Sequence, residues 1–362
     1  MLASKFEQHP LIHFLRDPCC AEHFDHHKWE RLFRSARLGY LASRVGWLAR
    51  QSGIWDKIPL RIRFHLDSAL QVSASQSVSV LWEVTQIEKA FAKDSIPFVL
   101  LKGAGYVKGQ LQAAHGRIMS DVDIMVPKRQ LGVAEKALYE HGWFPTKIDA
   151  YDQRYYRKWM HELPPMQHLD RGTSIDVHHT ILPPTARLKP DTQKLWNSAI
   201  ELEAGKRVLI LSPHDMILHS ASHLFHDGEL EHGLRDLADI VALLNQFSEQ
   251  PHFFEVLIDR AIEHELTYPL YYALKYSAVF LRITLPANAL AKLARFTAQS
   301  GASHEFMDLI VINSIGSILD DSFSAKSSAS QFAMYVRSHY LRMPLHQLLP
   351  HLLRKQFIKD SK

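Results

Sequence analysis

Residues 118–126 constrain the fold more than any other stretch of this chain, because their side chains alternate with a period of two. One face would carry Val122, Ile124 and Val126, and the other would carry Asp121, Asp123 and Met125. A period of two is that of a β-strand. The stretch therefore predicts a half-buried strand with two carboxylates side by side on its open face.

The residues before this strand predict helices and one short strand. From Leu11 to Phe91 the pattern is helical, and it ends on an apolar stripe at three- and four-residue steps. The members of this stripe are Val80, Leu81, Val84, Ile87 and Phe91. The apolar run Phe98–Leu101 then predicts a short buried strand, ended by the turn Lys102–Gly105. We expect a helix through Leu111 after it.

Two further elements follow the alternating strand. Arg129–Glu140 has helical periodicity, Gly142 suits a helix C-terminus, and Trp143-Phe144 starts an extended piece. Residues 166–169 and 174–180 flank the tetrapeptide Asp170-Arg171-Gly172-Thr173. Such a tetrapeptide predicts a β-hairpin whose glycine takes a positive φ.

Beyond a charged connector at residues 189–194, the patterns are helical again. Ser212 and Pro213 suit the N-cap and first turn of a helix, and amphipathic stripes continue to Leu341. We therefore expect an α+β fold, in which a small mixed β-sheet core is flanked by N-terminal and C-terminal helical regions. The expected domains are residues 1–74, 75–185 and 186–362.

Composition supports an ordinary globular protein of more than one unit. A chain of 362 residues exceeds the roughly 250–300 residues at which single cores usually stop growing. The formal net charge of +4 does not by itself indicate nucleic acid. Cys19 and Cys20 are adjacent and cannot build a disulfide framework, and no apolar run suits a leader or a transmembrane segment. We expect a cytoplasmic protein, and the sequence leaves its oligomeric state open.

Asp121 and Asp123 are candidate metal ligands. On a strand, residues i and i+2 face the same way about 6–7 Å apart, and Mg²⁺ prefers oxygen ligands. Asp176 lies in a similar apolar-acid-apolar setting on a later strand, with His178 on the same face. Three acids aimed at one point repel one another unless cations lie between them. Taken alone, however, an Asp-x-Asp pair is usually only the solvated face of a strand.

The order of the motifs supports the metal-site interpretation. A strand, a glycine-containing turn and a helix precede the segment Arg117-Ile118-Met119-Ser120-Asp121-Val122-Asp123, and Ile175-Asp176-Val177-His178 follows it. In this order the chain resembles the nucleotidyltransferase superfamily of DNA polymerase beta and the aminoglycoside nucleotidyltransferases. It most closely resembles a bacterial family of uncharacterised nucleotidyltransferases, with a Leu-Lys-Gly turn, a Met-Ser-Asp-x-Asp strand and a later Asp-x-His strand. The resemblance covers residues 75–182 and continues more weakly to residue 244.

The resemblance implies roles for individual residues. Asp121 and Asp123 would bind two Mg²⁺ or Mn²⁺ ions, and Asp176 would complete the site of the ion that activates the acceptor hydroxyl and could receive its proton. The implied nucleotide-binding residues are Lys102, Gly103, Gly105, Arg117, Ser120 and His178. Gly103 would correspond to the phosphate-binding turn, and Lys102 and Arg117 would contact triphosphate oxygens.

Some of these roles have ordinary alternatives. Lys102-Gly103 can be a simple strand end, and His178 a hydrogen-bonded histidine at a sheet edge. The chain also departs from the wider superfamily, which usually has Gly-Gly or Gly-Ser at the turn and a shorter gap to the aspartate pair. Here Gly103-Ala104 stands in the turn, and Asp121 comes eighteen positions later.

These roles predict an enzyme, a metal-dependent nucleotidyltransferase that transfers NMP from an NTP to a hydroxyl or phosphate acceptor. AMP, from ATP, is expected because of the cellular abundance of ATP. The acceptor is a small molecule, a saccharide, a protein or an RNA. The alternative is a catalytically inactive nucleotide- or partner-binding protein that retains the fold, and the three intact acids favour the enzyme.

Histidine pairs in the C-terminal half suggest a rival class of enzyme. His214-Asp215 and His226-Asp227 invite comparison with metal-dependent phosphohydrolases, and His219 and His223 have the i, i+4 spacing that can chelate zinc. The rest of such motifs is missing, and a helix start explains His214-Asp215. We therefore favour the nucleotidyltransferase.

Two C-terminal features have more than one interpretation. Arg235 and Asp239 either line the acceptor side of the cleft or form an i, i+4 ion pair, which we favour. The basic, leucine-rich tail Leu345–Lys362 could lie on a membrane or a partner. Pro350 interrupts the tail, which favours packing or a frayed end.

Overall fold

The protein is described here from a computed structural model, in residues 4–227, 230–296, 301–319, 325–344, 346 and 348. One seven-stranded sheet lies at its centre, in the order β3-β4-β5-β2-β1-β7-β6. The strands are β1 (Phe98–Leu100), β2 (Asp121–Met125), β3 (Trp143–Pro145), β4 (Met166–His168), β5 (Ser174–His178), β6 (Ile200–Glu201) and β7 (Val208–Ile210). The sheet is mixed, because β2 pairs with β5 and β1 with β7 in parallel, and the other pairs are antiparallel. The α+β class is confirmed.

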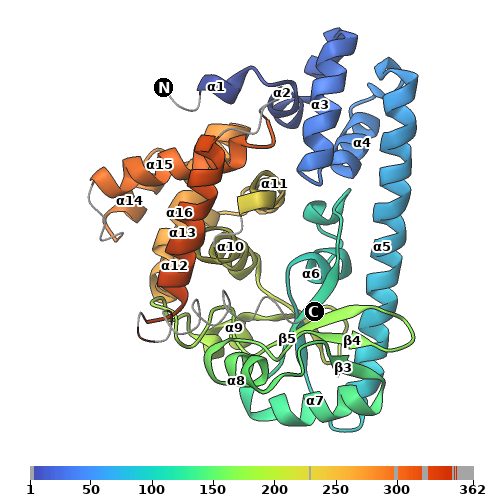
Figure 1. Cartoon of the computed structure of the whole chain (residues 1–362), viewed down its shortest axis with the longest axis vertical. Coiled ribbons are helices and arrows are strands. Elements are labelled where there is room, and N and C mark those ends of the chain that lie inside the picture. Colours follow the sequence, from blue (N-terminus) through green and yellow to red (C-terminus); the bar gives the residue numbers. More distant parts are fainter. Residues whose placement is uncertain are drawn as a thin grey trace.

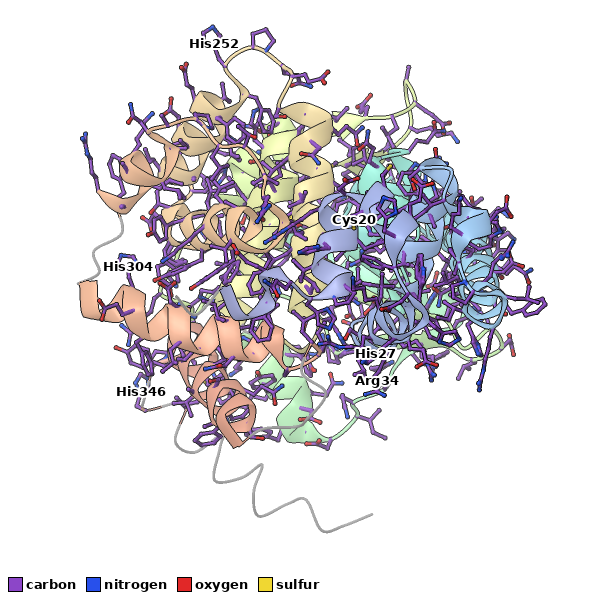
Figure 2. All side chains as sticks on the ribbon, turned by 90° about the horizontal axis from the view of Figure 1, so that it is seen from above. Cys20, His27, Arg34, His252, His304 and His346 are labelled. Carbon is purple, nitrogen blue, oxygen red and sulfur yellow. The ribbon has the colours of Figure 1, made fainter. Side chains whose placement is uncertain are left out.

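Helices surround the sheet (Figure 1). The N-terminal helices are α1 (Ser4–Glu7), α2 (Pro10–Arg16), α3 (His26–Leu38), α4 (Ala42–Gln51) and α5 (Leu60–Ala92). Those of the central region are α6 (Lys102–Lys108), α7 (Leu131–Glu140), α8 (Ala150–Trp159) and α9 (Thr192–Ser198). Those that follow are α10 (Pro213–Ser222), α11 (Gly233–Phe247), α12 (Phe253–Glu263), α13 (Thr267–Leu281), α14 (Ala289–Ala294), α15 (Gly301–Gly316) and α16 (Ala325–Arg342). Seen from above, the blue helix α3, which carries His27 and Arg34, and the orange C-terminal helices lie on opposite sides of the molecule, whereas α2 contacts α13 (Figure 2).

Helix α5 joins the N-terminal helices to the core. It contacts α4 as well as α6 and α7. Four members of the predicted apolar stripe are buried, namely Val80, Val84, Ile87 and Phe91. Leu81 is 38% exposed, so its place in the buried stripe was wrong. At about 100° per residue, Val80, Ile87 and Phe91 lie to one side of Val84 around the helix, and Leu81 lies about 60° to the other side.

Several local predictions are confirmed. Gly172 takes a φ of +67° in the turn that joins the antiparallel strands β4 and β5. Gly142 takes a φ of +91° just after α7, and Ser212 accepts a hydrogen bond from the backbone N–H of Asp215 at the start of α10. In each case a local pattern was enough, because the structure depends on a few neighbouring residues.

Two predictions about the sheet need correction. Strand β2 is not half-buried, because Met125 is fully buried and Asp123 is only 7% exposed. Other parts of the fold cover the face that the alternating pattern left to solvent. The short strands β6 and β7 were not predicted at all, and both follow residue 185. Strands of two and three residues are too short to show a period of two.

The apolar core is continuous across the chain. One cluster of buried apolar side chains runs from Phe6 in α1 to Met334 in α16, through β1, β2 and β5 of the sheet. Among the described residues, no helix combines the length and the apolar character needed to cross a membrane. The tail Leu345–Lys362 lies outside the described residues, apart from residues 346 and 348.

Candidate active site

The three predicted aspartates lie on neighbouring strands. Asp121 and Asp123 are on β2, and Asp176 is on β5, which runs parallel to β2. In this pairing Asp123 is directly opposite Asp176, and Asp121 is opposite Ser174. Paired residues on adjacent strands project to the same face of a sheet. The register therefore brings the three carboxylates together on one face, as the metal-site interpretation requires.

The carboxylates influence one another strongly. Burial raises the pKa of Asp176 to about 7, and the charges of Asp123 and Glu162 add to this shift. Burial and the charge of Asp123 also raise the pKa of Asp121. Like charges gathered in a partly buried site explain both shifts. A divalent cation among these oxygens would remove the repulsion, so the donor set fits a hard metal ion.

Asp123 differs because cations surround it. Its Oδ1 lies 3.4 Å from the Nζ of Lys102 and 3.1 Å from the Nε2 of His178. Burial would raise the pKa of Asp123, but Lys102 and His178 outweigh it and hold the pKa well below its usual range. Burial lowers the pKa of His178, but the hydrogen bond to Asp123 and the charge of Glu162 raise it by more. The pKa of His178 is therefore raised. Lys102 and His178 thus both lie close to the carboxylate of Asp123.

Lys102 owes its position to an unusual backbone. Strand β1 ends at Leu100, and Lys102 takes a φ of +42° at the start of α6. This left-handed conformation is rare for a residue with a side chain, and such conformations cluster at functional sites. From this position the ammonium group of Lys102 contacts Asp123.

A hollow of about 320 Å³ lies next to the aspartates. Its lining includes Lys102, Gly103, Arg117, Ser120, Asp121 and Asp123 among the predicted residues. The remaining lining residues are Tyr40, Tyr106, Ile118, Met119, Ser220, His223, His232, Arg235, Asp236 and Asp239. Asp121 and Asp123 thus share one hollow with Lys102, Arg117 and Arg235, an arrangement suited to metal ions and a polyphosphate.

Arg117 is held in this hollow by a buried ion-pair triad. Its Nε donates to Oδ2 of Asp239 at 2.7 Å, and Arg44 of α4 donates to Oδ1 of the same carboxylate at 2.6 Å. Burial would lower the pKa of Arg117, but the charges of Asp239 and Asp236 raise it by more than burial lowers it. The guanidinium therefore stays charged. The favoured ion pair between Arg235 and Asp239 was wrong, since Arg235 binds Asp236 at 2.8 Å instead.

The two glycines of the turn have different surroundings. A Cβ on Gly103 would lie 2.6 Å from Nη1 of Arg117, so the missing side chain leaves room for the guanidinium. A Cβ on Gly105 would lie 2.8 Å from the carbonyl oxygen of Leu100. Gly105 is not among the lining residues, and its close contact is with β1. Ser120 is exposed and donates to Oδ1 of Asp121 at 3.1 Å.

A histidine and glutamate cluster adjoins the aspartates. His161, Glu162 and His178 each place one possible ligand atom within 4.8 Å of the others. His178 lies 3.6 Å from Glu162 and 3.1 Å from Asp123, so it connects this cluster to the aspartates. The sequence predicted His178 but not His161 or Glu162, because they precede β5 in a segment without a clear pattern.

The site residues on α4 and α11 were not predicted as such. Arg44 was missed, and Asp239 was assigned to a pair with Arg235. Arg44, Asp236 and Asp239 are far from the aspartates in the sequence, and no local pattern distinguishes Arg44. Only the alternative interpretation of Arg235 and Asp239, that they line the cleft, pointed to this wall.

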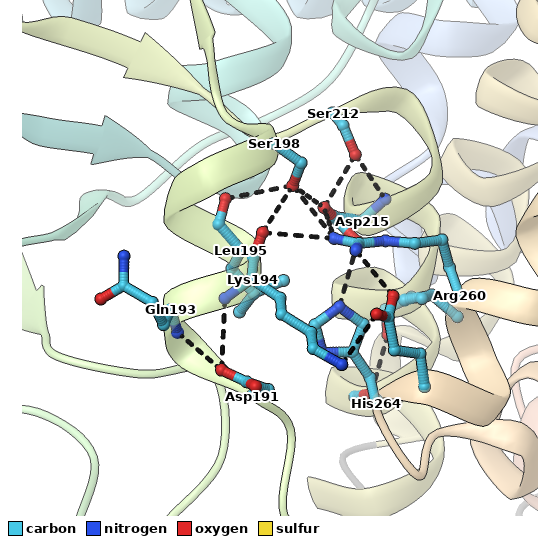
Figure 3. A network of polar contacts seen from close by, with 12 residues as sticks. Asp191, Gln193, Lys194, Leu195, Ser198, Ser212, Asp215, Arg260 and His264 are labelled. Carbon is cyan, nitrogen blue, oxygen red and sulfur yellow. Dashed lines mark hydrogen bonds and ion pairs between the residues drawn. The ribbon is translucent and has the colours of Figure 1, made fainter.

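The His214-Asp215 pair of the rival enzyme class has a structural role. Asp215 is fully buried and accepts hydrogen bonds from Ser198, Ser212 and Arg260, at 2.5, 2.8 and 2.7 Å (Figure 3). This network joins α9, α10 and α12. The ring of His214 stacks on Phe253. Asp227 has no described side chain, and among the described residues His219 and His223 belong to no group of three possible metal ligands.

Comparison with known proteins gives one match. A model of a family described as "uncharacterised nucleotidyltransferase" matches residues 25–282. The match extends beyond residues 75–182 in both directions, and it includes the α3–α4 turn and α11, which line the hollow. No curated protein and no solved structure matches the chain.

Proposed function

Since the chain belongs to this family of uncharacterised nucleotidyltransferases and is an enzyme of that class, we propose that it transfers NMP from an NTP to a hydroxyl or phosphate acceptor. The reaction would use Mg²⁺ or Mn²⁺, and ATP is the expected donor. One observation carries the proposal. Asp123 and Asp176 are paired in register on parallel strands, Asp121 is two residues away, and a cationic hollow adjoins them.

Asp121, Asp123 and Asp176 would hold two metal ions. Bound there, the ions supply charge neutralisation at the triphosphate and lower the pKa of the attacking group. The donor set supports this assignment, because its oxygens are hard and its charges are otherwise unbalanced.

The protein's own cations would bind the triphosphate. Lys102 and Arg117 line the hollow from the turn and from the segment before β2, and Arg235 lines it from α11. They would stabilise the charge that develops on the phosphate oxygens as the bond to the leaving group breaks. The triad with Asp239 holds Arg117 in place, so its charge needs no rearrangement during the reaction.

Asp176 would receive the proton of the acceptor. In the transfer, an acceptor oxygen forms a bond to the α-phosphorus, the bond to the β-phosphate breaks, and pyrophosphate leaves. Asp176 is paired with Asp123 in the register of β2 and β5, so its carboxylate would lie beside an acceptor that is activated at the same site. His178 and Lys102 would keep Asp123 ionised during this step.

The test is incorporation of nucleotide from NTPs labelled at the α-phosphate, with Mn²⁺ or Mg²⁺ and a panel of small-molecule, saccharide, protein and RNA acceptors. We expect Asp121→Asn and Asp123→Asn to lower incorporation by about 10²–10³-fold, because metal ligands contribute several kcal/mol. Asp170→Asn, in the exposed hairpin turn, is the matched control and should have no effect.

Unchanged incorporation in the Asp121 and Asp123 variants would refute the proposal. Metal-dependent NTP binding with no product across the panel would favour the alternative of a nucleotide-binding protein. We also propose a cytoplasmic location, which the two free cysteines support.

A further inference from the structure

An aromatic pair lines the same hollow as the aspartates. The rings of Tyr40 and His232 lie edge to face, with centroids 4.5 Å apart and planes at 72°. Tyr40 lies in the turn between α3 and α4, and His232 immediately precedes α11. Two segments almost two hundred residues apart therefore place aromatic rings in the same hollow as Asp121, Asp123 and Arg117.

Nothing in the turn requires a tyrosine at position 40. Its φ of +56° is left-handed, a conformation in which glycine or asparagine would be the usual choice. Backbone hydrogen bonds from Gly39, Tyr40 and Leu41 to the last residues of α3 form the turn without any side chain.

Core packing does not require this ring either. Tyr40 is 49% exposed, and no hydrogen bond of its hydroxyl to a described residue is formed. The Nδ1 of His232 is buried and has no hydrogen-bond partner among the described residues. The ring is therefore kept at a conformational cost on the wall of a hollow, which indicates a ligand.

We propose that Tyr40 and His232 bind the base of the donor nucleotide by stacking. This inference rests on the proposed function, and it adds the part of the site that recognises a planar heteroaromatic ring. Because the two planes are at 72°, His232 can cover at most one face of the Tyr40 ring. The other face is free of His232, so a base can stack there. Lys102, Arg117 and Arg235 supply the cations for the phosphates in the same hollow.

Stacking on an aromatic ring tolerates every base, because each base has a π-face. The pair should thus strengthen binding of all NTPs, and it should leave binding of a polyphosphate without a base unchanged. This difference separates a role in base binding from a role in shaping the hollow.

The experiment compares two ligands on the full chain by calorimetry with Mn²⁺. One is ATP with a methylene group between its α- and β-phosphates, which cannot be turned over, and the other is inorganic tripolyphosphate. Tyr40→Gly should weaken binding of the ATP analogue by about 10-fold or more, as loss of one stacking contact does, and leave tripolyphosphate binding unchanged. Glycine adopts a φ of +56° freely, so this variant should fold. Tyr40→Phe keeps the ring and is the matched control.

Two results would overturn the inference: equal affinity of wild type and Tyr40→Gly for the analogue, or an equal loss for both ligands. His232→Ala is a second variant with the same expected selective loss, should Tyr40→Gly fail to fold. A wild-type protein that binds neither ligand would instead refute the proposed function, and with it this inference.

Discussion

At the scale of single residues, the site opposes the stability of the protein when metal is absent. Asp176 has a pKa raised to about 7 by burial and by the charges of Asp123 and Glu162. A raised pKa means that the ionised form is destabilised in the folded state. The cost is absent below the ordinary pKa of about 4, grows as the pH rises toward 7, and is complete above it.

Asp176→Asn should therefore stabilise the metal-free protein at pH 8. We expect a gain of about 1–3 kcal/mol in the free energy of unfolding, because the neutral amide removes the repulsion. Urea denaturation in EDTA measures the gain, which should shrink at pH 5 because less of the repulsion remains there. Asp170→Asn is the control, since Asp170 is exposed and should show no gain. Added Mg²⁺ should stabilise wild type more than Asp176→Asn, and lower stability of this variant in EDTA at pH 8 would contradict the prediction.

At the scale of elements, Asp239 joins parts of the chain that are distant in sequence. It binds Arg44 of α4 and Arg117 before β2, and it lies on α11. All three side chains are at least 89% buried. Removing one partner of a buried pair leaves an uncompensated charge, which costs about 3–5 kcal/mol.

Asp239→Asn should thus destabilise the protein by about 3–5 kcal/mol, because two buried guanidinium groups lose their counter-charge. It should also raise the KM for NTP more than it lowers kcat, since Arg117 would lose its position but not its charge. Chemical denaturation and steady-state kinetics measure the two effects. Arg50→Ala is the matched control on α4, because Arg50 and its partner Asp67 are 49% and 40% exposed and such pairs contribute about 1 kcal/mol or less. Equal effects of the two substitutions would refute a special role for Asp239.

The elements also show how far the sequence could predict the fold. Strand β2, the hairpin with Gly172 and the start of α10 at Ser212 were predicted because a few neighbouring residues determine each of them. Strands β6 and β7 were missed because β7 forms by pairing with β1 and β6 by pairing with β7, which a pattern of two or three residues cannot show. The covering of the acid face of β2 depends on distant parts of the chain in the same way.

The same difference between local patterns and distant contacts explains which site residues could be predicted. Asp121, Asp123 and Asp176 each had a local strand pattern and a motif order, and their roles as metal ligands stay predictions. The pairing of Asp239 with Arg44 had no such pattern, because the two residues are 195 positions apart in the chain. Gly105 had a pattern, but its close contact with Leu100 requires only packing.

At the scale of the whole molecule, the three predicted domains share one apolar core and one hollow. One apolar cluster extends from α1 to α16, and the hollow takes its walls from the α3–α4 turn, the sheet and α11. A ligand in that hollow touches residues 1–74, 75–185 and 186–362 at once. The division into these domains stays a prediction about sequence regions, and their independence can be measured.

We expect the chain to unfold as one cooperative unit that responds as a whole to ligand. A ligand that binds only the folded state stabilises it by about 2.7 kcal/mol at a hundredfold excess over Kd. For a chain of 362 residues this corresponds to a rise in Tm of about 3–4 °C. Calorimetry with and without Mn²⁺ and the non-hydrolysable ATP analogue should show a single transition that shifts by this amount. Two transitions, of which only one shifts, would contradict the prediction, because a helical region would then unfold independently of the ligand. We expect one transition because a single apolar cluster connects α1 with α16.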